Sequence, residues 1–166
     1  MAKPMAIIGM AMRLPGSVRS ADDLWDLLSA RKSGLCDIPK NRFNADGFYD
    51  PARGPGTIPV KKGYFLHDVQ IEEFDTNVFP IPRMELELLD PAQRQLLQVA
   101  YECIENAGGT SWRGSRTGCY IGEFGEDFAD SSARESQQRG NLRYTGLADF
   151  AIANRISYEL DLQGPR

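Results

Sequence analysis

Histidine and cysteine are scarce in this chain of 166 residues. It has one histidine, His67, and three cysteines, Cys36, Cys103 and Cys119, which lie far apart in the sequence. A zinc site needs several such ligands at close spacing, so this pattern argues against zinc binding. The odd number of cysteines and the lack of any N-x-Ser/Thr acceptor are typical of a reduced intracellular protein, and we expect a cytoplasmic location.

Long apolar runs are also absent. No segment approaches the roughly 20 apolar residues that span a bilayer. The short apolar run after Lys3 is interrupted by Arg13 and Pro15, so the N-terminus lacks the layout of a signal peptide. The formal net charge is -4 at pH 7, which gives no reason to expect nucleic acid or a membrane as a partner.

Glycine-rich nucleotide motifs are missing too. No segment matches G-x-G-x-x-G or G-x-x-x-x-G-K-Ser/Thr, so nucleotide binding has no support beyond a general α/β pattern. Clustered carboxylates could bind a divalent cation, but their spacing here differs from that of an EF-hand, and we interpret them as exposed acidic surface. They are Glu123, Glu126, Asp127 and Asp130. We therefore expect no cofactor and no metal.

The clearest positive pattern begins at Asp90. Its side chain can accept hydrogen bonds from the free N–H groups of a first helical turn, and Pro91 suits a first helical position. Apolar residues then recur at three- and four-residue steps, which predicts an amphipathic helix over Pro91–Ala107. Gly108 and Gly109 can adopt the left-handed conformation that ends it. The predicted buried face consists of Leu96, Leu97, Ala100, Ile104 and Ala107, and it leaves out Gln93.

Two more helices and two strands are predicted. Ser20 and Asp23 have the spacing of a capping box before a helix over Ala21–Arg31, and a third helical pattern covers Leu147–Leu160. The expected buried face of the first helix is Leu24, Trp25, Leu27 and Leu28. Short apolar runs predict strands at Met5–Met10 and Thr117–Gly122, which we expect to pair in one sheet. Prolines and glycines make Asp37–Lys62 a long loop. The fold class is therefore α/β.

Several blocks of this sequence resemble the ketosynthase of type I polyketide synthases. In chain order they are MAIIGMAMRLPG, LWDLL, IPKNRFNADGFYDP, GYFL, LLDPAQRQLLQVAYECIENAG, SRTGCYIGEFGEDF and ANRISYELDLQGP. They cover essentially the whole chain in the family's order. The sequences YECIENAG, TSWRG and ANRISYELDL are most similar to those of the fungal highly reducing iterative synthases. We therefore interpret residues 1–166 as the N-terminal segment of a beta-ketoacyl synthase.

The resemblance implies a layered thiolase-like fold, of which this chain would be the incomplete N-terminal half. It also implies a homodimer that condenses an acyl chain with malonyl units carried on an acyl carrier protein. The family's catalytic cysteine and both catalytic histidines fall beyond the position of Arg166, which itself replaces the usual serine. We therefore expect a segment truncated before the nucleophile, with no catalytic residue of its own and no condensing activity alone.

Contact residues can be assigned by resemblance only. The region that matches Tyr144–Ala153 lies near the dimer interface and the acyl pocket in related ketosynthases. This makes Thr145, Phe150 and Asn154 candidates for contact with the acyl chain or a second subunit. In an alternative interpretation, Phe150 fills the core and Asn154 satisfies a turn.

Two functions from different classes remain open at this point. The chain is either a piece of a condensing enzyme, or a stand-alone non-catalytic accessory that binds a polyketide synthase or its acyl carrier protein. A reading frame that continues into the nucleophile segment favours the first, and a natural stop after Arg166 favours the second. An unrelated dinucleotide-binding protein is a distant third interpretation, which would require retention on a dinucleotide column.

Overall fold

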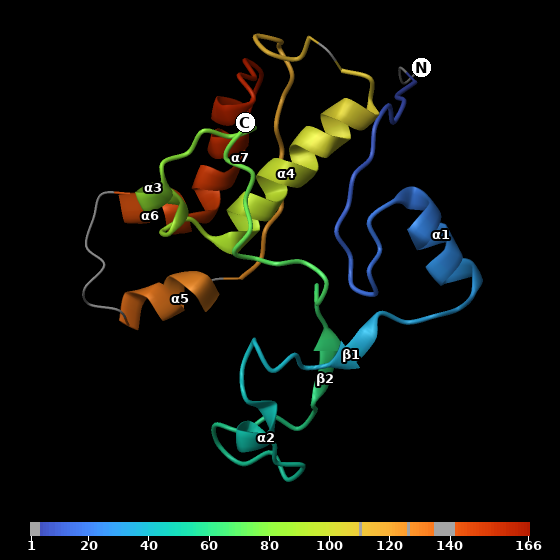
Figure 1. The fold of residues 1–166 in the computed structure, drawn as a ribbon, viewed down its shortest axis with the longest axis vertical. Helices are drawn as coiled ribbons and strands as arrows, with labels where there is room; N and C mark the ends of the chain where they lie inside the picture. The colour runs from blue at the N-terminus through green and yellow to red at the C-terminus, as the bar shows by residue number, and fades with distance from the viewer. Residues whose placement is uncertain (1–3, 110, 126, 135–141) are drawn as a thin grey trace. The chain divides into compact units, whose positions relative to one another are not determined.

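The helix predicted after Asp90 is the longest element that the structure describes. In this computed structural model, α4 extends from Pro91 to Asn106 (Figure 1). The Asp90 side chain accepts the Ala92 backbone N–H at 2.7 Å, which caps the first turn. Gly108 follows the helix with φ +71°, a left-handed conformation that glycine adopts without strain. The described residues are 4–109, 111–125, 127–134 and 142–166.

The chain divides into two units, which we describe separately. The core unit comprises Met1–Met10 and Ile71–Arg166, and the loop unit comprises Ala11–Gln70. The helices of the core unit are α3 (Arg83–Leu86), α4, α5 (Asp127–Arg134), α6 (Leu142–Leu147) and α7 (Asp149–Glu159). The elements of the loop unit are α1 (Ala21–Ser29), β1 (Leu35–Asp37), α2 (Ala45–Phe48) and β2 (Lys62–Tyr64).

In the core unit, α7 packs along α4 (Figure 1). Ile152, Ile156 and Leu160 recur at four-residue steps and form the buried stripe of α7. They pack with Leu97 of α4 in one hydrophobic cluster. The other buried members of this cluster are Phe79, Ile81, Leu89, Cys119 and Leu162. This packed pair of helices positions the α7 residues of the candidate site described below.

The loop unit is held mainly by local contacts. β1 and β2 form an antiparallel pair of three residues each, with Cys36 opposite Gly63. Prolines and glycines occupy much of the chain between the two strands, which limits α2 to four residues. Among the described residues of this unit, Val18 is the one fully buried apolar side chain. This unit therefore has turns and a short hairpin in place of a core.

The predicted helices are confirmed to within two residues at each end. Predicted Ala21–Arg31, Pro91–Ala107 and Leu147–Leu160 correspond to α1, α4 and α7. The capping box is present as well: the Asp23 N–H donates to Ser20 Oγ at 3.1 Å, and the Ser20 N–H donates to Asp23 Oδ2 at 2.9 Å. Ends defined by capping chemistry were thus readable from sequence.

The predicted pairing of Met5–Met10 with Thr117–Gly122 is wrong in this structure, where neither segment belongs to a strand. A strand needs a neighbour with matching donors and acceptors. The Cys119 N–H instead donates to the carbonyl of Pro165 at 2.9 Å, and the Gly164 N–H donates to Thr117 at 3.1 Å. The backbone of Thr117 and Cys119 is therefore bonded to the last residues of the chain, and the Met10 N–H donates to Asn106 Oδ1.

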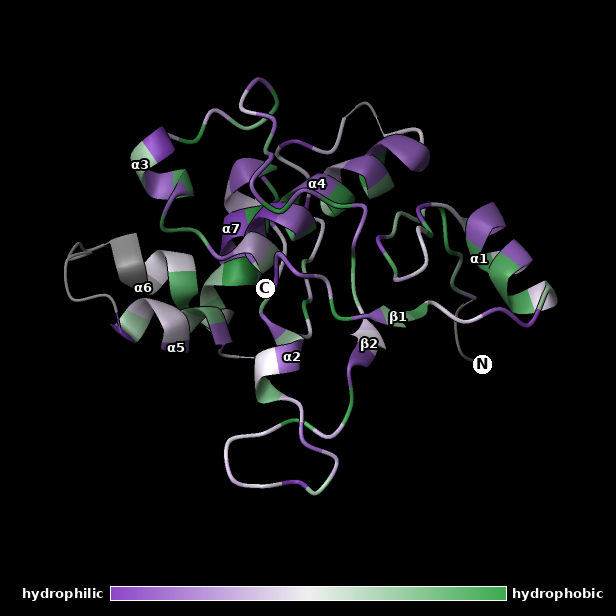
Figure 2. Ribbon diagram, turned by 60° about the horizontal axis from the view of Figure 1, so that its bottom comes forward, coloured by the Kyte–Doolittle hydropathy of each residue, from purple (hydrophilic) through white to green (hydrophobic). Residues whose placement is uncertain are grey.

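The predicted buried face of α1 is wrong in part: Leu24 and Leu27 are half-buried, but the other two members are exposed. Trp25 is 71% exposed and Leu28 is 60% exposed, and α1 contains no fully buried residue. Figure 2 shows apolar residues, drawn in green, along this helix beside polar ones. An amphipathic pattern predicts a face that prefers burial, but the loop unit supplies no core for it.

Candidate functional site

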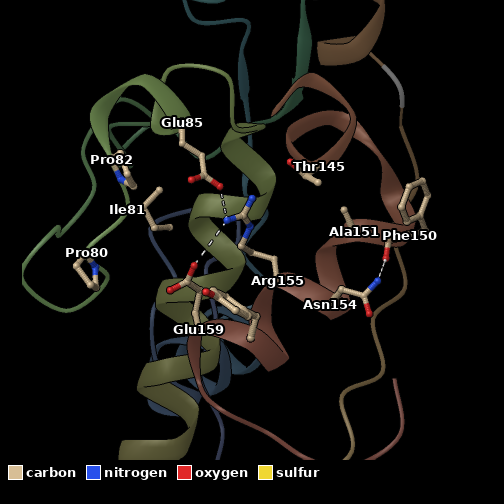
Figure 3. Close-up of a pocket in the computed structure, with 11 residues that line it drawn as sticks. Pro80, Ile81, Pro82, Glu85, Thr145, Phe150, Ala151, Asn154, Arg155 and Glu159 are labelled. Carbon is tan, nitrogen blue, oxygen red and sulfur yellow. Dashed lines mark hydrogen bonds and ion pairs between the residues drawn. The ribbon is translucent and has the colours of Figure 1, made fainter. Parts of the chain in front are cut away.

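A pocket of about 600 Å³ lies in the core unit, between the segment that leads into α3 and the helices α6 and α7 (Figure 3). Its lining includes all three residues that the resemblance singled out: Thr145, Phe150 and Asn154. Pro80, Ile81 and Pro82 form part of the opposite wall. The pocket therefore brings together residues that are about 70 positions apart in the sequence, with mostly apolar walls of the kind that bind small molecules.

One face of α7 borders the pocket. Phe150, Asn154 and Tyr158 recur at four-residue steps, so they share this face. The alternative in which Phe150 fills the core is wrong, because this side chain is 69% exposed. Asn154 Nδ2 donates to the Phe150 carbonyl at 3.1 Å (Figure 3), so this side chain bonds within its own helix.

Arg155 lies between two carboxylates at the edge of the pocket (Figure 3). Its Nη1 is 2.5 Å from Glu85 Oε1 and 3.6 Å from Glu159 Oε1. The side chains of Arg155 and Glu159 are each 12% exposed, and that of Glu85 is 21% exposed. Such shielded charges interact more strongly than pairs in open solvent. The network therefore ties α3 to α7 and gives the pocket one polar end.

Gln93 is a residue of this region that the sequence analysis missed. It is buried, with 1% of its surface exposed, although it was left out of the predicted core face of α4. Its Nε2 donates to the carbonyls of Thr145 and Gly146 at 3.4 and 3.1 Å. Its position four residues before Leu97 was the available signal, because residues at that spacing share a helix face.

Burial perturbs two charged groups at the start of α4. It raises the pKa of the Asp90 carboxyl above its usual value, against the hydrogen bond from the Ala92 N–H, which lowers it. The charge of Asp127 raises the same pKa further. Burial also lowers the pKa of Arg94, against the charges of Glu72 and Asp90, which raise it. These groups surround the N-terminus of α4 and do not line the pocket.

The cysteines and the histidine are not paired as a nucleophile and base in the contacts that the structure shows. Cys119 is buried in the core cluster, and Cys103 lies inside α4. In the loop unit, Cys36 Sγ is 3.7 Å from the Gly63 carbonyl oxygen, while His67 Nε2 is 3.5 Å from Ser17 Oγ. A thiolate needs a base or an electropositive setting, which these contacts do not supply.

The acidic cluster of the sequence falls partly outside the described residues, since Glu126 lies there. Within the described ranges, no three residues of the metal-binding types converge. No described helix has the length and apolar content needed to cross a membrane.

The loop unit has a pocket of its own, of about 640 Å³, bordered by Asp37, Lys40 and Phe43. Lys61 Nζ bonds to Asp46 Oδ1 at 2.6 Å and lies 4.4 Å from the centre of the Tyr49 ring. Lys61 is therefore paired with Asp46, and the walls of this pocket are more polar than those of the first pocket. The pocket of the core unit is the better candidate for an apolar ligand.

Comparison with known proteins places these features in a family context. The family described as "Beta-ketoacyl synthase, N-terminal domain" matches residues 2–166. A highly reducing polyketide synthase of Purpureocillium lilacinum is 57% identical over 165 residues, which are 99% of this chain and 7% of that protein. One of Glarea lozoyensis is 48% identical over 164 residues, 98% of this chain and 6% of that protein.

Solved structures agree with this result. The ketosynthase from module 6 of the bacillaene synthase from Bacillus subtilis 168 superposes with a TM-score of 0.74 at 34% sequence identity. The match covers 96% of this chain and 25% of that one. The chain thus spans 6 to 7% of the length of the two curated relatives above and a quarter of this solved ketosynthase.

Proposed function

Because the chain belongs to the beta-ketoacyl synthase N-terminal domain family, we propose that it is the N-terminal segment of a polyketide synthase ketosynthase. The sequence identity of 57% across 99% of the chain carries this proposal. The resemblance to ketosynthases, the mixed helix and strand content and the structural match support the N-terminal part of a thiolase-like fold. The biological role that follows is polyketide biosynthesis within a larger synthase, in the cytoplasm.

The proposed parent reaction is a decarboxylative Claisen condensation. A cysteine thiolate holds the growing acyl group as a thioester, and a malonyl thioester on a carrier protein loses CO₂ to form an enolate. The enolate carbon attacks the acyl carbonyl, a carbon–carbon bond forms, and the cysteine leaves as thiolate. This chemistry needs an activated thiol and groups that stabilise the developing negative charge.

The residues of this chain do not supply those groups, so we propose that it is inactive alone. Cys119 is buried among apolar side chains and Cys103 lies in a helix that packs on the same cluster, while Cys36 contacts a backbone carbonyl. None of these contacts supplies the base or electropositive setting that an activated thiol needs. The single histidine, His67, contacts Ser17.

The role proposed for the pocket is to hold part of the acyl chain or to border a second subunit. Phe150 offers an exposed aromatic surface, and Ala151, Ile81 and the two prolines beside Ile81 offer further apolar wall. Burial of apolar surface contributes about 25 cal/mol per Å², so such walls favour an alkyl chain over a charged ligand.

A stand-alone accessory role is the second candidate, and one observation supports it. The core unit exposes several large apolar side chains that a second polypeptide could cover: Met5, Ile7, Ile8, Tyr120 and Phe124. A contiguous exposed apolar patch marks an interaction surface, and these side chains are the candidates for one. The partner would be a polyketide synthase or its acyl carrier protein.

Mass spectrometry tests the proposal. The purified chain is incubated with an acyl thioester and malonyl carrier protein, and each cysteine is checked for an acyl adduct. We expect no adduct and no extended product, whereas an intact ketosynthase in parallel forms both. An acylated cysteine followed by chain extension would refute inactivity. A change in product seen only when a synthase is added would favour the accessory role.

A further inference from the structure

The end of α6 is held by a side chain from α4. Thr145 and Gly146 lie in the last turn of α6, where backbone carbonyls have no partner within the helix. Gln93 Nε2 donates to both carbonyls, at 3.4 Å for Thr145 and 3.1 Å for Gly146. The Asp90 backbone N–H donates to the Gly146 carbonyl as well, at 2.9 Å. The start of α4 therefore caps the end of α6.

The same junction is tightly packed on its other side. A Cβ atom added to Gly146 would lie 2.5 Å from the Leu88 carbonyl oxygen, so the two backbones are in direct contact there. Leu89 beside this contact is fully buried. The backbone at Gly146 is thus fixed both by close contact and by hydrogen bonds.

Gln93 also has an energetic disadvantage that points to a specific role. Its Oε1 atom is buried and has no hydrogen-bond partner among the described residues. A buried polar atom without a partner destabilises the folded state, and a leucine at this position would avoid that cost. The two hydrogen bonds that Nε2 donates are the gain that offsets this cost.

We propose that Gln93 is a positioning residue, which sets where the α6–α7 wall of the pocket stands and so how long an acyl chain the pocket accepts. The inference rests on the acyl-binding role proposed above. Thr145 borders the pocket one residue before the fixed glycine, and Phe150 borders it four residues after that glycine. Gln93 itself does not line the pocket, so it acts through the backbone that it holds.

Three variants of the 166-residue chain test this. Gln93→Glu keeps the shape of the side chain and cannot keep both hydrogen bonds, because an ionised carboxylate donates none and a protonated one donates only one. Gln93→Leu removes both polar atoms. Gln98→Leu, on the same helix, is the matched control. The probes are the N-acetylcysteamine thioesters of decanoic and acetic acid, and the readouts are dissociation constants and backbone amide NMR signals of Thr145–Ala148.

We expect both Gln93 variants to weaken decanoyl binding about tenfold, because a displaced α6–α7 wall loses apolar contact with the end of the chain. Acetyl binding should change less than about twofold, because a short chain does not reach the displaced wall. The amide signals of Thr145–Ala148 should shift in both Gln93 variants. Gln98→Leu should change neither affinity nor these signals.

Other outcomes would overturn the positioning role of Gln93 or the acyl pocket. Decanoyl affinity equal to that of the unaltered chain, or equal weakening for both probes, overturns the positioning role. If the unaltered chain binds neither probe, the proposed acyl pocket is refuted. The amide signals then still test whether Gln93 holds the end of α6. In that case, unchanged amide signals in Gln93→Leu overturn the anchoring role of Gln93. Amide shifts that occur in Gln93→Leu and not in Gln98→Leu support an anchor for a pocket that takes another ligand.

Discussion

The core unit and the loop unit use the same residue types in different ways. In the core unit, the apolar residues of α4 and α7 recur at helical spacing and meet in one cluster. In the loop unit, α1 has an equally clear pattern, yet Trp25 and Leu28 remain mostly exposed. Amphipathic periodicity thus predicts a helix and a preferred face, but a second apolar surface decides whether that face is buried.

The largest difference between the units should appear when a leucine is shortened. Leu97→Ala removes a fully buried side chain from the core cluster and should lower the free energy of unfolding by about 3 kcal/mol. Leu28→Ala on the exposed side of α1 should lower it by less than about 0.5 kcal/mol. Urea unfolding followed by circular dichroism measures both. Equal decreases in the free energy of unfolding for the two variants would contradict the conclusion that only the core unit has a hydrophobic core.

Backbone contact gives the next largest effect. Gly146→Ala places a methyl group 2.5 Å from the Leu88 carbonyl oxygen and should cost about 1–3 kcal/mol of stability. Gly122→Ala, in the same unit, has nothing within 4 Å of the added carbon and should be close to neutral. Thermal unfolding compares the two. A neutral Gly146→Ala would show that the α6 end is not fixed as described.

A smaller, local effect is expected in the loop unit. Ser20→Ala removes the side-chain acceptor of the capping box and should cost about 1 kcal/mol. Because α1 has no fully buried residue, we expect this loss as faster hydrogen exchange confined to the helix. Ser29→Ala, at the other end of α1, is the control. Protection lost throughout the core unit would mean that the two units unfold together.

The smallest expected effect is an opposite pH dependence of stability for two aspartates, one in each unit. Hydrogen bonding to Lys61 lowers the pKa of Asp46 below 3.8, so the stability from Asp46 is present above that pH and is lost as pH falls through the folded value. Burial raises the pKa of Asp90 above 3.8. Its contribution is therefore present below pH 3.8 and is lost as pH rises through the folded value.

Asparagine at either position removes one titration. Asp90→Asn should flatten a decline of the melting temperature above pH 3.8, whereas Asp46→Asn should flatten a rise near that pH. Melting curves from pH 2.5 to pH 7 record both slopes. Identical profiles for the two variants would contradict the opposite environments of these carboxylates.

Local chemistry was predictable from sequence, and long-range pairing was not. Asp90 with Pro91, and Ser20 with Asp23, marked helix starts that the structure confirms. The sequence of a strand does not identify the segment with which it pairs. The backbone of Thr117 and Cys119 was therefore assigned to a sheet, although it bonds to the last residues of the chain. Gln93 was missed because a polar side chain was taken as exposed.

The pocket was predicted only in part. Resemblance named Thr145, Phe150 and Asn154, and the structure brings all three to one pocket. The opposite wall at Pro80–Pro82 and the ion pairs of Arg155 came from tertiary packing that no local pattern reveals. Whether these residues contact an acyl chain or a second subunit stays a prediction.

Photolabelling tests the central proposal, that the core unit carries the acyl-binding surface, most directly. A decanoyl thioester with a diazirine at the end of its chain is irradiated with the protein, and the labelled peptides are mapped by mass spectrometry. We predict labels within Thr145–Glu159 or Pro80–Glu85, and we predict that excess unlabelled decanoyl thioester removes them. Competed labels in the pocket of the loop unit, between Asp37 and Lys61, would contradict the proposal, as would labelling that excess ligand does not reduce.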